Sequence, residues 1–96
     1  MTRYTLGVKA EYAARDKLLE MGASLVVRSA GSHGPVDLVA FFPDYTLLVQ
    51  IKTTTRKNPS YRDDLDKLAA VDVASNCVKE LWCWFRNKRA WVILPC

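Results

Sequence analysis

The sequence predicts an α/β fold in which a central mixed five-stranded sheet is flanked by helices, in the order α-β-β-β-α-β-β. Two stretches, about 6–22 and 62–75, have the helical spacing of apolar residues, and five short apolar runs between and after them have the length of strands. Strands that alternate with helices in this way usually form one sheet covered by helices. The 96 residues are enough for one domain, so residues 1–96 are assigned to a single domain.

Glycine residues and polar stretches predict where these helices and strands end. Gly22 is a typical stop for the first helix, and the Ser- and Gly-rich stretch 29–35 predicts a loop. The polar stretch 53–61 predicts a second loop, and residues 86–89 predict a turn. The expected elements are a helix at about 6–22, strands at 25–28, 36–41 and 45–52, a helix from 62 to about 75, and strands at 80–85 and 91–94.

Composition and charge limit the classes of function. Half of the residues are hydrophobic, and a net charge of +4 favours an anionic partner where the cations gather on one face. The three cysteines form no C-x-x-C pair, which argues against a disulfide framework or a zinc site, and Cys83 is expected in the core. No apolar run approaches the ~20 residues of a membrane span, and the chain start resembles no signal peptide. We expect a cytoplasmic, intracellular protein with no membrane anchor or small-molecule cofactor; its brevity also fits a viral or phage-encoded version.

Two acidic residues stand in apolar surroundings, where a carboxylate is costly unless it is paired or binds a metal. Glu11 lies on the apolar stripe of the first helix, although a carboxylate there can also reach solvent. Asp37 opens the second strand, where Asp is unfavourable unless it caps the strand start. Both residues therefore have a structural as well as a functional interpretation. The other members of the helical stripe are Ala14, Leu18 and Met21.

Gln50 and Lys52 project from the same side of the third strand, because side chains alternate along a strand. A lysine at a strand end is usually a solvated residue that protects the sheet. If this pair converges with Glu11 and Asp37, however, the oxygen atoms suit Mg²⁺, with Mn²⁺ as a substitute. Lys52 could then orient or deprotonate an attacking water, which is what metal-assisted phosphodiester hydrolysis requires.

These residues resemble the active-site motif of the PD-(D/E)XK nucleases, with Pro-Val-Asp at 35–37 and Gln-Ile-Lys at 50–52. The order and spacing of four segments are similar to those of the archaeal-type Holliday junction resolvases: Gly7 with Glu11, and residues 27–32, 37–40 and 49–53. The resemblance covers about residues 7–55. It implies a restriction-endonuclease-like core and a homodimer that cuts branched double-stranded DNA at four-way junctions.

The resemblance also implies a role for each residue of the motif. Asp37 is expected to be the main metal ligand and Gln50 the second, with Ile51 contributing its backbone carbonyl and Glu11 completing the metal or water site. Lys52 is expected to be the catalytic lysine, with Ser32 in or beside the site. Expected DNA contacts come from Arg28, Ser29 and Ser32, and from His33, which would also fit a catalytic role.

Gln50 departs from the family pattern, which usually has Glu at this position. An amide oxygen can coordinate a metal but brings no charge, so weaker Mg²⁺ binding is expected. Some relatives in the wider superfamily use Gln-x-Lys, so this departure is compatible with an active enzyme. Gln50→Glu is predicted to keep or raise activity.

The loop after the third strand predicts contacts with DNA. It offers hydroxyl groups and cations without an acidic residue, which suits phosphate binding, although a solvated loop would have the same composition. Its cations are Arg56, Lys57 and Arg62. No motif for reading the major groove appears, so binding that is selective for shape and sensitive to salt is expected.

Two other functions fit the same residues. One is another PD-(D/E)XK nuclease, such as a Mrr-like or repair enzyme that cuts linear, flapped or nicked DNA. The other is a DNA-binding module with a degenerate active site, which the neutral Gln50 supports. The joint presence of Glu11, Asp37, Lys52 and Ser32 favours an enzyme.

Overall fold

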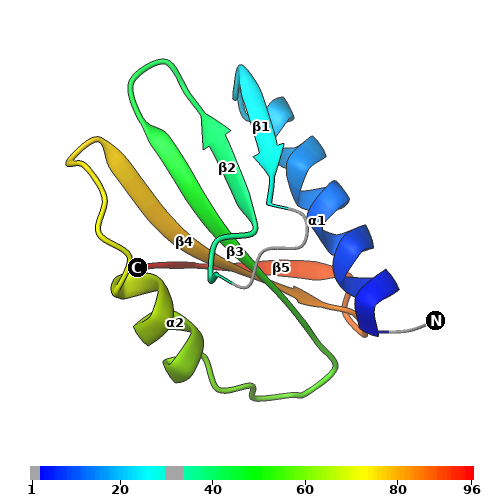
Figure 1. Cartoon of the computed structure of the whole chain (residues 1–96). Helices are drawn as coiled ribbons and strands as arrows, with labels where there is room; N and C mark the ends of the chain where they lie inside the picture. The colour runs from blue at the N-terminus through cyan, green and yellow to red at the C-terminus, as the bar shows by residue number, and fades with distance from the viewer. Residues whose placement is uncertain (1–2, 30–33) are drawn as a thin grey trace.

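The computed structural model describes residues 3–29 and 34–96, with side chains in the first helix from Leu6 onward. The predicted order of elements is confirmed, and the fold is α/β with a five-stranded mixed sheet flanked by helices (Figure 1). The elements are α1 (Arg3–Glu20), β1 (Leu25–Arg28), β2 (Leu38–Phe41), β3 (Thr46–Thr54), α2 (Arg62–Ala69), β4 (Cys77–Phe85) and β5 (Ala90–Pro95).

The strands lie in the sheet in the order in which they occur along the chain, β1-β2-β3-β4-β5. Neighbours are antiparallel except for β3 and β4, which are parallel. A parallel pair needs a crossover connection, and here it contains α2. The central strand β3 pairs with β4 along its whole length, from Thr46 opposite Cys77 to Thr54 opposite Phe85.

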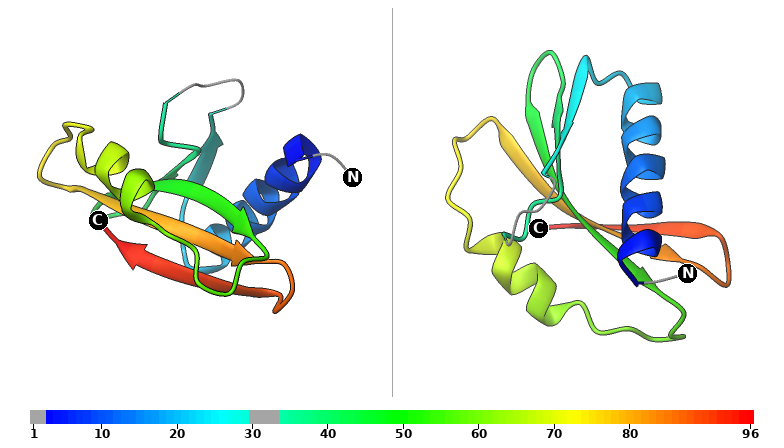
Figure 2. Two further views of the ribbon diagram at one scale, coloured as in Figure 1. Left: turned by 90° about the horizontal axis from the view of Figure 1, so that it is seen from below. Right: turned by 45° about the vertical axis from the view of Figure 1, so that its right-hand side comes forward.

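The two helices cover opposite faces of the sheet. Trp82 of β4 packs in the core beside Leu18 of α1. Lys79 lies an odd number of residues from Trp82, so its side chain points to the other face. There its Nζ donates to the carbonyl oxygens of Ala69 and Val71, at the end of α2. The helices accordingly lie apart from each other on the sheet (Figure 2).

The main core lies between α1 and the middle of the sheet. Leu18, Leu38 and Trp82 are completely buried there, and burying a side chain of this size typically contributes about 2 kcal/mol. The core thus fixes α1 over β2, β3 and β4. The other buried members of this cluster are Ala14, Ala23, Ala40, Leu47 and Val49.

The end of α1 corrects one expectation. The helix begins at Arg3 and ends at Glu20, and Gly22 adopts φ +110°, a conformation that glycine tolerates best. The expected burial of Met21 is wrong, because its side chain is 53% exposed. Met21 follows the last helical residue, so it no longer lies on the helical stripe that buries Leu18.

Other boundaries differ for reasons of pairing and capping. Thr53 and Thr54, expected in a loop, continue β3 because their partners in β4 hold the backbone extended. The helix α2 ends at Ala69 and does not continue to about residue 75. Lys79 Nζ donates to the carbonyl of Ala69 and to that of Val71 just beyond the helix, which stabilises this end. Within α2, Leu68 is buried and the neighbouring Ala69 is exposed. In the described part of the chain, neither helix is long and apolar enough to cross a membrane.

Candidate functional site

Asp37 is fixed at the start of β2 by both its backbone and its side chain. Its N–H donates to the carbonyl of Val49 (2.9 Å), and its carbonyl accepts the N–H of Ser29 (2.8 Å). Its Oδ2 accepts the backbone N–H of Ile51 at 2.7 Å. Asp37 therefore joins the end of β1 to the middle of β3, and its carboxylate caps the strand pair, as its structural interpretation expected.

The environment of Asp37 disfavours its charged form. Burial raises the pKa of this carboxyl from 3.8 to about 6, against the lowering effect of the Ile51 hydrogen bond. The neighbouring charge of Glu11 raises the pKa further, and that of Arg28 lowers it. A carboxyl group beside a second carboxylate and away from water is a common feature of catalytic sites.

Glu11 and Arg28 form an ion pair next to Asp37. Arg28 Nε donates to Glu11 Oε2 at 3.0 Å, and the two side chains are 22% and 15% exposed. The Arg28 guanidinium also lies 5.3 Å from the centre of the Tyr12 ring. The pair satisfies the carboxylate that the sequence places on the buried face of α1, and it links α1 to the end of β1.

Gln50 lies on the opposite face of the sheet, the one that α2 covers. With Lys67 of α2 and Ala70, which follows this helix, it lines a pocket of about 460 Å³, to which Gly34 and Pro35 also contribute. Its Oε1 is buried and has no hydrogen-bond partner among the described residues. An unsatisfied buried carbonyl oxygen typically costs about 1–3 kcal/mol, so this atom favours a ligand that donates or is positively charged.

Lys52 points to the same face as Gln50 but is held by the beginning of α2. Its Nζ donates to Asp64 Oδ2 at 2.7 Å and to the carbonyl of Ser60 at 3.0 Å. It also lies 5.9 Å from the centre of the Tyr61 ring. The structure thus places Lys52 on the expected strand, with its ammonium group bound to α2 rather than to Asp37.

Sequence reasoning missed Asp64, the partner of Lys52. It lies in the first turn of α2, where acidic residues are common because they interact favourably with the helix dipole. The residue therefore has an ordinary local explanation. The twelve residues between Lys52 and Asp64 include the loop before α2, so no helical or strand spacing connects the two.

The other residues predicted for the site and for DNA binding lie in β3, after β1, in the loop after β3 and in α2, or outside the described residues. Ser32 and His33 lie outside the described residues. Ile51 contributes its N–H to Asp37, and its carbonyl is the group that the resemblance assigns to the metal. Ser29 is partly buried behind Asp37. The cations predicted to bind DNA are exposed: Arg56 and Lys57 lie in the loop after β3, and Arg62 is the first residue of α2.

Cys83 is completely buried, as the sequence predicted. Burial raises the pKa of its thiol, and a hydrogen bond with the Tyr61 hydroxyl partly offsets this effect. A buried thiol of raised pKa is a poor nucleophile, so Cys83 is a structural residue.

The oxygen atoms around Asp37 fit a hard divalent cation in their chemistry. Within residues 3–29 and 34–96, no group of three or more His, Cys, Asp or Glu side chains could hold a metal ion. The neighbouring carboxylates are those of Glu11 and Asp37, and the further oxygen donor is the unsatisfied amide of Gln50. A cation beside Glu11 and Asp37 would relieve the charge repulsion between these two carboxylates.

Comparisons with known proteins assign this chain to no family. No protein-family model matches this sequence, and no curated protein matches it. The support for a function therefore comes from the residues around Asp37 and from the exposed cations Arg56, Lys57 and Arg62.

Proposed function

We propose that this protein is a metal-dependent DNA endonuclease with a restriction-endonuclease-like core, which resolves four-way junctions. The observation that supports the proposal most strongly is the raised pKa of the partly buried Asp37 carboxyl. This partly buried carboxyl, with a pKa of about 6, lies beside the charge of Glu11 and on the strand next to Gln50 and Lys52. Carboxyl groups with such perturbed pKa values are concentrated at catalytic sites.

Glu11 and Asp37 would hold Mg²⁺, with Mn²⁺ as a substitute; the resemblance adds Gln50, whose side chain would have to reach the ion from the α2 side of the sheet. Their oxygen atoms are the donors that these ions prefer. When bound, the ion would stabilise the negative charge that develops on the phosphate during hydrolysis. The neutral amide of Gln50 leaves the donor set with one negative charge fewer than three carboxylates would supply.

The side chains around this donor set orient it. The N–H of Ile51 fixes one oxygen of Asp37 and leaves the other available, and Arg28 fixes one oxygen of Glu11 in the same way. Lys52 would exchange Asp64 for the substrate phosphate, where its ammonium group neutralises charge or orients the attacking water. The exchange would cost Lys52 its hydrogen bonds with Ser60 and Asp64.

A homodimer would place two such sites on one junction. Two symmetric cuts require two active sites, and a twofold dimer is the simplest assembly that provides them. Leu25, Val27 and Phe41 expose between 39% and 55% of their surface, and Leu25 pairs directly with Phe41. This apolar surface of β1 and β2 is available for the partner subunit.

A second candidate is a DNA-binding module with a degenerate site. Two observations favour it: Gln50 brings no charge, and Lys52 is bound to Asp64. The same exposed cations would then bind branched DNA without cutting it. Cleavage distinguishes the two candidates.

The test is Mg²⁺-dependent cleavage of a labelled four-way junction by the wild type, Asp37→Asn and Asp44→Asn. The amide of the Asp37→Asn variant keeps an oxygen for the Ile51 N–H, so the fold should be retained. Asp44 is an exposed carboxylate between β2 and β3 and provides the matched control. We expect cleavage by the wild type and the Asp44 variant in Mg²⁺, and none in EDTA or with the Asp37 variant. Cleavage that persists in EDTA or in the Asp37 variant would contradict the proposal.

A further inference from the structure

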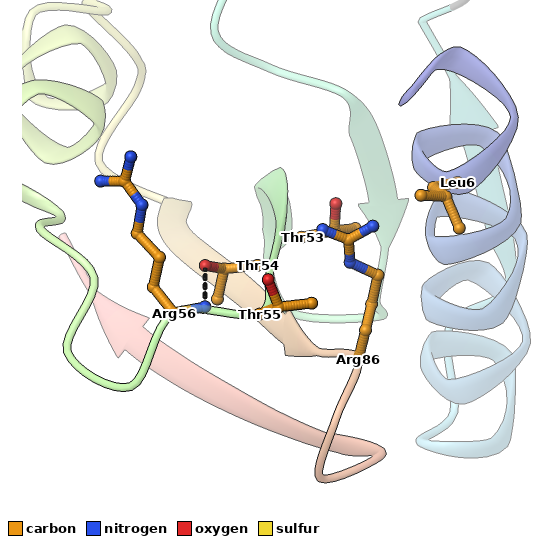
Figure 3. A pocket seen from close by; sticks show the side chains of 6 residues that line it. All are labelled: Leu6, Thr53, Thr54, Thr55, Arg56 and Arg86. Carbon is orange, nitrogen blue, oxygen red and sulfur yellow. Dashed lines mark hydrogen bonds between the residues drawn. The ribbon is translucent and has the colours of Figure 1, made fainter. Parts of the chain in front are cut away.

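A basic pocket of about 360 Å³ lies where β3 and β4 end. Arg56 and Arg86 stand on either side of three consecutive threonines (Figure 3). Its lining contains no acidic side chain; it consists of Leu6, Thr53, Thr54, Thr55, Arg56 and Arg86. The chemistry of two guanidinium groups and several hydroxyls is that of a site for an oxyanion.

The backbone around this pocket is already fixed. The N–H of Arg86 donates to the carbonyl of Thr54 at 3.0 Å, which fastens the end of β4 to that of β3. Thr54 Oγ1 accepts the N–H of Arg56 at 3.0 Å and caps the turn that follows β3. The two arginines are therefore held on a rigid frame, and a bound anion would order little more than their side chains.

Arg86 also has an unused donor. Its Nε is buried and has no hydrogen-bond partner in the part of the chain that the structure describes. Buried donors are nearly always satisfied, so an orphaned guanidinium N–H at a pocket needs an explanation. Arginine binds phosphate oxygens through adjacent N–H groups in a planar fork, and a phosphate in this pocket would satisfy them.

The pocket lies on the same face of the sheet as Glu11. Leu6 and Glu11 are both on α1, and their separation of five positions corresponds to about 7–8 Å along the helix axis. Thr53 lies two residues beyond Ile51 on β3 with the same side-chain direction, and Thr54 lies three beyond, which corresponds to about 7–10 Å. The distance along α1 and the distance along β3 therefore agree. One DNA strand advances about 3.4 Å for each nucleotide, so this distance is that of roughly two or three nucleotides.

We infer that this pocket binds a backbone phosphate of the DNA strand two or three nucleotides from the bond to be cut. The inference rests on the proposed function, and it joins Arg86 to the threonine hydroxyls and Arg56, which the sequence suggested for phosphate contacts, in one subsite. The subsite would position the strand without reading its bases, because its groups recognise phosphate.

The first experiment measures the salt dependence of binding to a linear duplex, in EDTA, by the wild type, Arg86→Gln and Arg89→Gln. Arg89 is exposed in the same β4–β5 turn, so its variant loses the same charge outside the pocket. For Arg86→Gln we expect roughly tenfold weaker binding at low salt. The slope of log K against log salt should become less negative by about 0.9, the value for one lost phosphate contact, and should change less for Arg89→Gln. Equal slopes for the two variants would overturn the inference.

A second experiment keeps the inference testable if Arg86→Gln does not fold. Arg56→Gln changes an exposed loop residue, and inorganic phosphate is titrated while the amide NMR signals of residues 53–56 are followed. We expect saturable shifts in the wild type that weaken in Arg56→Gln; an absence of shifts in the wild type overturns the subsite. If the slope change and the phosphate shifts are found but no DNA is cut, the phosphate site is supported and the nuclease proposal is rejected.

Discussion

Replacing Asp37 by Asn should make the metal-free protein more stable at pH 8. The wild-type carboxyl must ionise in a site that raises its pKa from 3.8 to about 6. A rise of about two units in the pKa corresponds to a loss of ~3 kcal/mol in the free energy of unfolding when the carboxyl is fully ionised. The side chain is only partly buried, so solvent screening reduces the expected gain to roughly 1–2 kcal/mol. Asn keeps the acceptor for Ile51 and carries no charge, so it gains this stability without losing the strand cap.

The pH dependence follows from the direction of the shift. Because the folded pKa of Asp37 is raised, the folded state binds the proton more tightly than the unfolded state does. The contribution of Asp37 to stability is therefore fully present below pH 3.8 and is lost as the pH rises through about 6. Asn cannot titrate, so the advantage of the variant should be largest at pH 8 and nearly absent at pH 4.

The measurement is urea unfolding of the wild type, Asp37→Asn and Asp44→Asn at pH 4 and pH 8, in EDTA. The difference between the wild type and Asp37→Asn should grow by roughly 1–2 kcal/mol between the two pH values. Asp44 is exposed, so its variant should follow the wild type at both. A difference for Asp37→Asn that is the same at pH 4 and pH 8, or that reverses, would refute the reasoning about its burial.

Three further substitutions test other parts of the molecule. Gln50→Glu adds the missing charge, so half-maximal cleavage should need less Mg²⁺ at an equal or higher rate; loss of all cleavage with metal binding intact would contradict the assigned role. Asp64→Asn removes the ion pair of the partly exposed Lys52, which should lower the free energy of unfolding by about 1 kcal/mol and speed cleavage; an unchanged rate would show that Asp64 does not restrain Lys52. Leu18→Ala should cost about 2–5 kcal/mol in chemical denaturation, because Leu18 is completely buried between α1 and the sheet. A loss below ~1 kcal/mol would mean that this packing is not formed in solution.

The order and type of the elements could be predicted because each has a local signal. The helical stripe of α1 contains the buried Ala14 and Leu18, and the run at 25–28 becomes β1 with the expected bounds. Gly22 marks the end of α1 through its positive φ. These features depend on residues near one another in the chain, which is where periodicity and glycine are informative.

The candidate site could be predicted only in part, because its contacts join distant segments. The helical stripe predicts that Glu11 lies on the buried face of α1, but no local pattern predicts its ion pair with Arg28, which is 17 positions away. The alternation of side chains places Lys52 on the correct strand, but its ion pair with Asp64 depends on the path of the loop between β3 and α2. The pocket at Arg86 depends on β4 pairing in register with β3, which no local pattern determines.

The most direct test of the central claim is competition between two substrates in one reaction. A labelled four-way junction and a linear duplex of the same arm sequence are mixed with the wild-type protein in Mg²⁺, and the cleavage rates are compared. The proposal predicts paired nicks in the junction and little cutting of the duplex. Equal cutting of both would show a nuclease without junction selectivity, and tight junction binding with no cutting of either would contradict the claim that the protein is an enzyme.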